Sequence, residues 1–113
     1  MARGEIYLAM FPFGDVPGMK LRPVLTLTDA IGPVPEVVVA YISSVIPANA
    51  LPSDILIDPS RREHGQTNLK VPSVLRLHKV ATIHTRALAR RLGLASPQII
   101  VEASQKLRTL LNL

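Results

Sequence analysis

The chain has 113 residues with 48% hydrophobic content, which is enough for one core without disulfide bonds, so we expect a single domain over residues 1–113. It contains no cysteine, which excludes a disulfide framework and a thiolate nucleophile. Thirteen Lys and Arg against eight Asp and Glu give a formal charge of +5, and this excess favours a polyanionic partner such as a nucleic acid.

The N-terminus lacks the pattern of a secretory signal, because Arg3 and Glu5 precede a short apolar run that Pro12 interrupts. The longest clearly apolar stretch, residues 37–42, is too short to span a bilayer. These features, with the absence of cysteine, indicate a cytoplasmic protein.

Strand patterns dominate the first half of the chain. Residues 5–11 predict a first strand, residues 12–20 a loop rich in Gly and Pro, and residues 21–28 a second strand. Pro23 places the start of the second strand at a sheet edge or at the mouth of a site. Residues 37–42 are a continuous run rich in β-branched side chains, which is typical of a central strand covered on both faces.

The second half alternates shorter strands with loops. Residues 53–58 predict a short strand, residues 59–68 a polar loop, and residues 71–83 one long strand or two strands joined by a bend. Local propensity favours a short helix over residues 85–92.

A final helix has the clearest start. Ser96 followed by Pro97 is an N-cap with a proline in the first turn, and Glu102 and Lys106 lie four residues apart in the favourable order. The expected apolar stripe consists of Ile100, Ala103, Leu107, Leu110 and Leu111. The order of the elements predicts a mainly β fold, a barrel of five or more short strands closed by one C-terminal helix.

Several short motifs, taken in order, resemble the PemK/MazF family of toxins from type II toxin-antitoxin systems. They are Gly4-Glu5-Ile6, Phe11-Pro12-Phe13, Arg22-Pro23-Val24-Leu25, Val38-Val39-Ala40-Tyr41-Ile42-Ser43-Ser44, Pro72-Ser73-Val74-Leu75-Arg76-Leu77, Thr82-Ile83 and Leu92-Gly93-Leu94-Ala95-Ser96-Pro97. The resemblance extends over nearly the whole chain. In this family the segment after Ile83 usually forms a turn and a short strand, which we prefer to the helix that local propensity favours.

The resemblance implies an SH3-like small barrel of about five to seven strands closed by a C-terminal helix, and a homodimer. It also implies a metal-independent, sequence-selective endoribonuclease, an mRNA interferase that cleaves single-stranded mRNA by attack of a 2′-OH on the phosphodiester. The expected partners are single-stranded RNA and a cognate antitoxin whose flexible tail lies across the RNA groove. No cofactor is implied.

Two residues match the family's catalytic positions most directly. Arg22 matches the arginine of the family's Arg-Pro motif, and a guanidinium suits phosphate stabilisation or proton donation because it is a planar donor that stays charged. Ser43 matches the Thr or Ser that the family carries at the end of the central strand, and its hydroxyl can donate to a phosphate oxygen. Ser44 faces the other way if the strand continues, so it is the lesser candidate.

Arg76 and His78 are further catalytic candidates because they share one face of a strand. In some family members the corresponding pair is an arginine and an aspartate with acid and base roles, and here His78 stands in place of the aspartate. An imidazole can act as general base, although His78 also fits an ordinary half-buried strand histidine. Asp15, the one carboxylate of the loop over residues 12–20, lies seven residues before Arg22. If neither His78 nor this carboxylate acts as the base, catalysis would rest on Arg22 and on electrostatic preorganisation.

Other basic residues suit contacts with an RNA backbone, namely Lys20, Arg61, Arg62, Lys70 and Lys79. Aromatic residues make up only 4% of the chain, so Phe13 and Tyr41 are the candidates for base stacking. The three histidines show no metal-ligand spacing with carboxylates, so we expect no metal site.

Two other functions fit the same sequence. The first is a toxin on the same barrel that poisons DNA gyrase, and the second is a catalytically silent dimer that only binds an antitoxin. Arg22 together with Ser43 favours RNA cleavage, whereas the missing carboxylates leave room for the silent dimer. Residues 37–42 and the Leu-rich C-terminal helix provide apolar surface for a dimer interface or for a well-packed monomer core.

Overall fold

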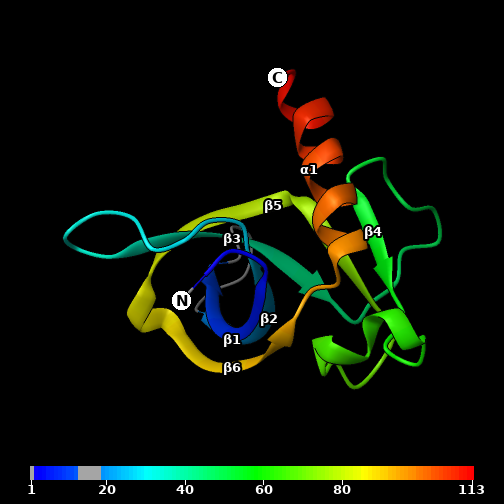
Figure 1. Ribbon diagram of the computed structural model, residues 1–113, viewed down its shortest axis with the longest axis horizontal. Helices are drawn as coiled ribbons and strands as arrows, with labels where there is room; N and C mark the ends of the chain where they lie inside the picture. The colour runs from blue at the N-terminus through cyan, green and yellow to red at the C-terminus, as the bar shows by residue number, and fades with distance from the viewer. Residues whose placement is uncertain (1, 13–18) are drawn as a thin grey trace.

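The computed structural model describes residues 2–12 and 19–113, which form an antiparallel sheet and one C-terminal α-helix (Figure 1). The strands are β1 (Glu5–Pro12), β2 (Met19–Thr26), β3 (Glu36–Ser43), β4 (Asp54–Ile57), β5 (Ser73–His84) and β6 (Leu88–Leu94). Two short 3₁₀ helices, η1 (Arg62–Thr67) and η2 (Thr85–Ala87), and the helix α1 (Pro97–Leu111) complete the fold. Most of the expected Gly- and Pro-rich loop, including Phe13 and Asp15, lies outside the described residues.

The six strands form one sheet in the order β4-β5-β3-β2-β1-β6. The sheet is not closed, because β4 and β6 are its two edges. The mainly β fold with a C-terminal helix is therefore confirmed, while the expected closure into a barrel is wrong. The physical reason is the shortness of β4, whose four residues all pair with β5 and do not extend the sheet toward β6.

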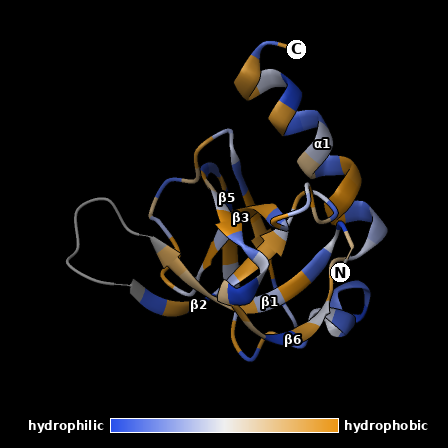
Figure 2. Ribbon diagram, turned by 90° about the vertical axis from the view of Figure 1, so that its left-hand side faces the viewer, coloured by the Kyte–Doolittle hydropathy of each residue, from blue (hydrophilic) through white to orange (hydrophobic). Residues whose placement is uncertain are grey.

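Side chains from both faces of β3 are buried in two hydrophobic clusters. Ala40 and Ile42 belong to the cluster that includes Ile99 of α1, whereas Val37 and Val39 belong to a second cluster. The prediction of a central strand covered on both faces is confirmed. In Figure 2 hydrophobic residues recur along the strands in the middle of the sheet.

The start of α1 agrees with its predicted cap. Ser96 Oγ accepts a hydrogen bond of 3.2 Å from the N–H of Ile99, and Pro97 is the first helical residue. The expected apolar stripe is wrong in part, since Leu110 and Leu111 are 41% and 59% exposed. The first turns of α1 pack on the sheet, and its last turns extend beyond it (Figure 1). In the described part of the chain, no helix combines the length and the apolar character needed to cross a membrane.

After Ile83 the chain turns through η2 and then forms β6, as the family resemblance implies. The helix favoured by local propensity over residues 85–92 is therefore wrong. β6 pairs with β1 in an antiparallel ladder in which Leu8 faces Arg90 and Glu5 faces Leu94. This pairing across the length of the chain overrides a weak local preference.

Gly93 lies where the end of η1 contacts β6. A Cβ atom at Gly93 would come within 2.1 Å of the backbone oxygen of Gln66 and within 2.7 Å of that of Thr67. Asn68 ends η1 with a left-handed φ of 55°, and its side-chain amide donates to the backbone oxygen of Leu92 at 2.7 Å. Glycine thus allows the segment after η1 to be fixed directly against β6.

Replacing Gly93 by alanine should lower the free energy of unfolding by roughly 1–3 kcal/mol, because a methyl group must displace backbone atoms that are already in contact. Gly65→Ala is the matched control, since nothing lies within 4 Å of its added Cβ, and its effect should stay within about 0.5 kcal/mol. Urea unfolding followed by circular dichroism measures both. Equal midpoints for the two variants would contradict the close contact.

Candidate functional site

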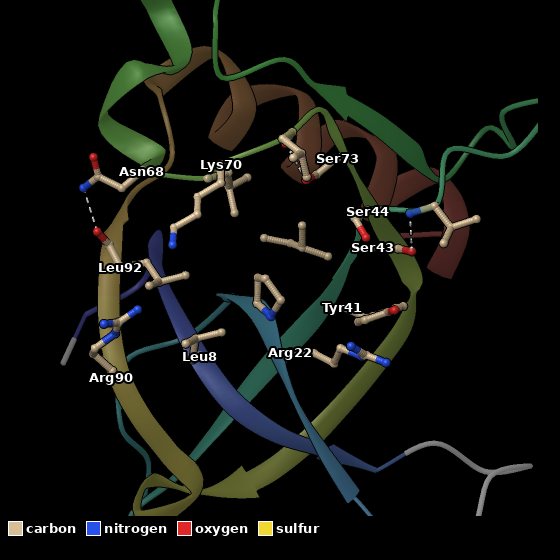
Figure 3. Close-up of a pocket in the computed structure, with 15 residues that line it drawn as sticks. Leu8, Arg22, Tyr41, Ser43, Ser44, Asn68, Lys70, Ser73, Arg90 and Leu92 are labelled. Atoms are coloured by element: carbon tan, nitrogen blue, oxygen red, sulfur yellow. Dashed lines mark hydrogen bonds between the residues drawn. The ribbon is translucent and has the colours of Figure 1, made fainter.

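The ladder between β2 and β3 is short. Pairing is limited to Val24, Leu25 and Thr26 of β2, opposite residues 39–41 of β3. Pro23, the next residue of β2, has no backbone N–H to donate into a ladder. Beyond this point the two strands no longer pair, and residues from both of them line a pocket of about 370 Å³ (Figure 3).

Arg22 of β2 and Ser43 of β3 both lie at this opening. Val24 pairs with Tyr41 in the last rung of the ladder, and Arg22 and Ser43 lie two residues beyond this rung on their own strands. Arg22, Tyr41 and Ser43 all line the pocket, and Figure 3 shows them on one side of it. The structure therefore brings together the two residues that match the family's catalytic positions most directly.

The hydroxyl of Ser43 is held in place by the turn that follows β3. Its side chain is buried, and Oγ accepts a hydrogen bond of 3.0 Å from the N–H of Val45. A hydroxyl has one donor position and two acceptor positions, so this contact uses an acceptor position and leaves the proton for donation to a ligand. Arg22 is half-buried at the same opening.

Positive charge and apolar surface characterise the rest of the pocket. Its cationic side chains are Arg22, Lys70 and Arg90, and no Asp or Glu occurs among the described residues that line it. Leu8 and Leu92 add apolar surface. A concave lining with cations and without carboxylates favours an anionic ligand.

Lys70 was expected to contact RNA, whereas Arg90 was not among the expected site residues. Arg90 reaches the pocket only because β6 pairs with β1, where it faces Leu8. The two strands are far apart in the sequence, and local propensity favours a helix in the later segment. No short-range pattern in the sequence signals this placement.

Arg76 and His78 lie outside this pocket, beside Asp54. Arg76 Nε donates to Asp54 Oδ1 at 3.0 Å, and the Asp54 side chain has 0% exposure. His78 Nδ1 is 2.7 Å from Ser53 Oγ and 4.0 Å from Asp54 Oδ1. Lys106 of α1 donates to the backbone oxygen of Asp54 at 2.9 Å, so this cluster fastens the helix to the sheet.

Electrostatics keep Asp54 ionised and His78 neutral. Burial by itself raises the pKa of Asp54, but the hydrogen bonds from the Leu51 N–H and Arg76, with the charge of Arg76, hold that pKa below its usual value. Burial lowers the pKa of His78, and the charge of Arg76 lowers it further against the opposing effect of Asp54. The carboxylate and guanidinium therefore form a compact ion pair with an uncharged imidazole beside them.

The remaining RNA-binding candidates are scattered. Lys20 is exposed near the start of β2, and Arg62 is exposed at the start of η1. Arg61 forms an ion pair of 2.9 Å with Glu63.

Two of the candidates, Lys79 and Tyr41, lie close to each other. Lys79 Nζ lies 5.8 Å from the centre of the Tyr41 ring, and that ring packs against Phe11 with a centroid distance of 5.3 Å. Phe13, the other expected stacking residue, lies outside the described residues. Tyr41 is thus the stacking candidate that the structure places at the pocket.

The free energy of unfolding should depend on pH through His78. Its pKa in the folded protein lies below the ordinary 6.5, so between these two values the unfolded chain binds more protons than the folded one. The stabilisation is therefore complete above pH 6.5 and is lost as the pH falls through the folded-state pKa of His78. Urea unfolding between roughly pH 5 and 8 measures this, with His78→Gln as the reference. If the free energy of unfolding depends on pH in the same way in the parent and in His78→Gln, the lowered pKa of His78 is contradicted.

Residues 2–111 match the family model described as "PemK-like, MazF-like toxin of type II toxin-antitoxin system". Among curated proteins, no sequence matches the chain. Two solved structures with the same fold are the Mycobacterium tuberculosis toxin MazF-mt6 and MazF from Deinococcus radiodurans. The first has a TM-score of 0.73 at 22% identity, covering 96% of this chain and 97% of that chain. The second has a TM-score of 0.69 at 18% identity, covering 99% of this chain and 96% of that chain.

A third solved structure is a mycobacterial endoribonuclease in complex with its cognate antitoxin. It has a TM-score of 0.71 at 18% identity, and the alignment covers 100% of this chain and 96% of that chain. At these identities the structural likeness establishes the fold, and the family match establishes the relationship. The chain therefore belongs to the family of PemK-like and MazF-like toxins of type II toxin-antitoxin systems.

Proposed function

We propose that this protein is a metal-independent endoribonuclease that cleaves single-stranded mRNA at selected sequences. The observation that carries the proposal is the placement of Arg22 and Ser43 together at the opening of one cationic pocket. Family membership supports it, as does the name of a structural neighbour, "Endoribonuclease in complex with its cognate antitoxin".

The proposed reaction is an internal transesterification of RNA. The 2′ oxygen forms a bond to phosphorus while the bond from phosphorus to the 5′ oxygen breaks, and the 2′-OH loses a proton as the 5′ oxygen gains one. Negative charge accumulates on the non-bridging phosphate oxygens. The guanidinium of Arg22 stabilises that charge, and the hydroxyl of Ser43 donates to the same phosphate.

We propose that electrostatic stabilisation, and not Arg76 or His78, provides most of the rate acceleration. Both residues are engaged around Asp54, and the described lining of the pocket includes neither of them. In this proposal they are structural residues that anchor α1 and the start of β5. The two pairs, Arg22 with Ser43 and Arg76 with His78, can therefore be separated by experiment.

Arg22→Ala should lower kcat/KM for a single-stranded RNA in EDTA by about 10²-fold or more, because loss of one preorganised donor has an effect of that size. Ser43→Ala should lower it by about tenfold or more, since a hydrogen bond to a charged group is lost. Cleavage kinetics on a fluorescent RNA measure both. Arg108→Ala, on the exposed side of α1, is the charge-matched control and should leave the rate unchanged.

The same cleavage assay tests the role of His78 and the alternative functions. His78→Gln should retain cleavage within about threefold at a temperature where it remains folded, and a larger loss in kcat would show that His78 acts in the chemistry. Unchanged cleavage by Arg22→Ala would exclude the proposed mechanism. Absence of cleavage by the parent, together with inhibition of DNA gyrase, would identify the binding-type toxin instead.

We also propose a cognate antitoxin as partner, with its flexible tail over the pocket, and a homodimer as the assembled form. The structural neighbour in complex with its antitoxin supports the antitoxin as a partner. The apolar end of α1 supports the homodimer, because Leu110, Leu111 and Leu113 are 41%, 59% and 86% exposed. Hydrophobic residues recur along α1 up to this end (Figure 2).

Sedimentation equilibrium should therefore give the mass of a dimer for the parent at micromolar concentrations. A double variant, Leu111→Lys with Leu113→Lys, should sediment as a monomer because it places charge on the apolar end of α1. Val34→Lys, at a distant residue that is 65% exposed, should retain the dimer. A monomeric parent would contradict the proposed assembly.

A further inference from the structure

Arg90 belongs to a row of residues that crosses three strands. Leu8 of β1 pairs with Pro23 of β2 on one side and with Arg90 of β6 on the other. Paired residues of antiparallel strands present their side chains on the same face, and all three line the pocket. Two strand spacings of about 4.8 Å place Arg90 roughly 10 Å from Pro23. Figure 3 shows Arg90 across the pocket from Arg22 and Ser43.

The neighbouring arginine has a different position and a different partner. Arg91 pairs with Tyr7, so it faces the other side of the sheet, and its Nε donates to Glu5 Oε2 at 2.6 Å. Among the described residues, no carboxylate forms an ion pair with Arg90. The charge of Arg91 is therefore balanced by Glu5, whereas the charge of Arg90 is presented to the pocket.

Lys70 adds a second cation on the same side. It follows η1, in the segment that is held against β6 by the close contact at Gly93 and by the hydrogen bond from Asn68 to Leu92. Figure 3 shows Lys70 and Arg90 on the side of the pocket that Leu92 occupies. The two cations come from segments that are fixed to each other, so the site is organised before a ligand binds, which lowers the cost of binding.

Apolar surface separates this cationic end from the end with Arg22 and Ser43. Leu8 and Pro23 lie between the two ends, in the row that leads from Arg90 toward β2, and Leu92 adds apolar surface on the cationic side. Single-stranded RNA has the matching pattern, since each phosphate is followed by a ribose and a base with an apolar face before the next phosphate. A ligand with one isolated anionic group would leave one end unused.

We infer that Arg90, assisted by Lys70, binds the phosphate next to the cleaved linkage and thereby determines how RNA is positioned in the pocket. This inference rests on the endoribonuclease function proposed above. Arg90 is a substrate-binding residue and takes no part in the bond changes. The ribose and base between the two phosphates lie on Leu8 and Pro23.

The first test uses an RNA oligonucleotide that the parent protein cleaves. Arg90→Ala should raise KM by about tenfold and leave kcat within about twofold, because contact with a non-reacting phosphate stabilises the bound substrate and the transition state equally. Arg90→Lys should recover part of the loss because it keeps the charge. Arg91→Ala, with the same change in charge on the other face, should leave KM within about twofold of the parent.

The second test measures binding to the same oligonucleotide with a 2′-deoxy nucleotide at the cleavage position. The slope of log Kd against log salt concentration should decrease by about one for Arg90→Ala, as expected for one lost phosphate contact, and should not change for Arg91→Ala. A series of oligonucleotides with one neutral methylphosphonate each then locates the contact. At the linkage that Arg90 binds, neutralisation should weaken binding by the parent and should not weaken binding by Arg90→Ala further.

The outcomes separate the two proposals. If the parent cleaves the RNA but Arg90→Ala matches Arg91→Ala in KM and in salt slope, the second phosphate contact is wrong and the proposed function remains. The proposed contact is also wrong if, at each linkage next to the cleaved one, neutralisation weakens binding by Arg90→Ala as much as it weakens binding by the parent. If the parent neither cleaves nor binds RNA, both proposals fail. Unfolding curves of each variant identify any loss that comes from loss of structure.

Discussion

The early end of the β2 and β3 ladder is the constraint on which the candidate site depends. On one side of Pro23, β2 pairs with β3, and past it β2 continues only with β1. β3 likewise continues along β5 beyond its last pairing with β2. The two strands are held apart by their outer partners, so Arg22 and Ser43 face an opening. Two more rungs in this ladder would close the space in which a ligand can bind.

The Asp54 cluster shows how the charge of Arg76 on β5 is used within the fold. Asp54 is fully buried, and Arg76 balances its charge while Lys106 binds its backbone oxygen. Removing one partner of a buried ion pair costs about 3–5 kcal/mol, because the remaining charge has no compensation. Arg76 is therefore committed to the fold, whereas Arg22 lies at the opening beside Ser43, where a phosphate can reach it.

The elements predicted correctly are those that depend on local chemistry. The β-branched run of β3 and the Ser96 cap of α1 are determined by side chains that act within a few residues. The role proposed for Arg22 and Ser43 rests on the family resemblance, and the structure adds that both residues line one pocket. These features needed no knowledge of which strands are neighbours.

The features that sequence reasoning missed depend on contacts between distant segments. Arg90 reaches the pocket through the pairing of β6 with β1, and no periodicity in either strand encodes that pairing. Asp54 lies beside Arg76 because β4 pairs with β5, so the partner that engages Arg76 was not recognised. The open sheet and the exposed end of α1 are likewise set by how far β4 and the helix extend, which a hydrophobic pattern does not specify.

The open sheet also leaves β6 as an edge strand, and an edge offers unpaired N–H and C=O groups to which another chain can add. β6 carries Arg90 and Arg91 on its two faces, and its register shifts twice against β1. Charge and irregularity at an edge both oppose the addition of a further strand. Arg90 and Arg91 therefore oppose edge-to-edge aggregation, and their replacement by uncharged residues would reduce the solubility of the protein.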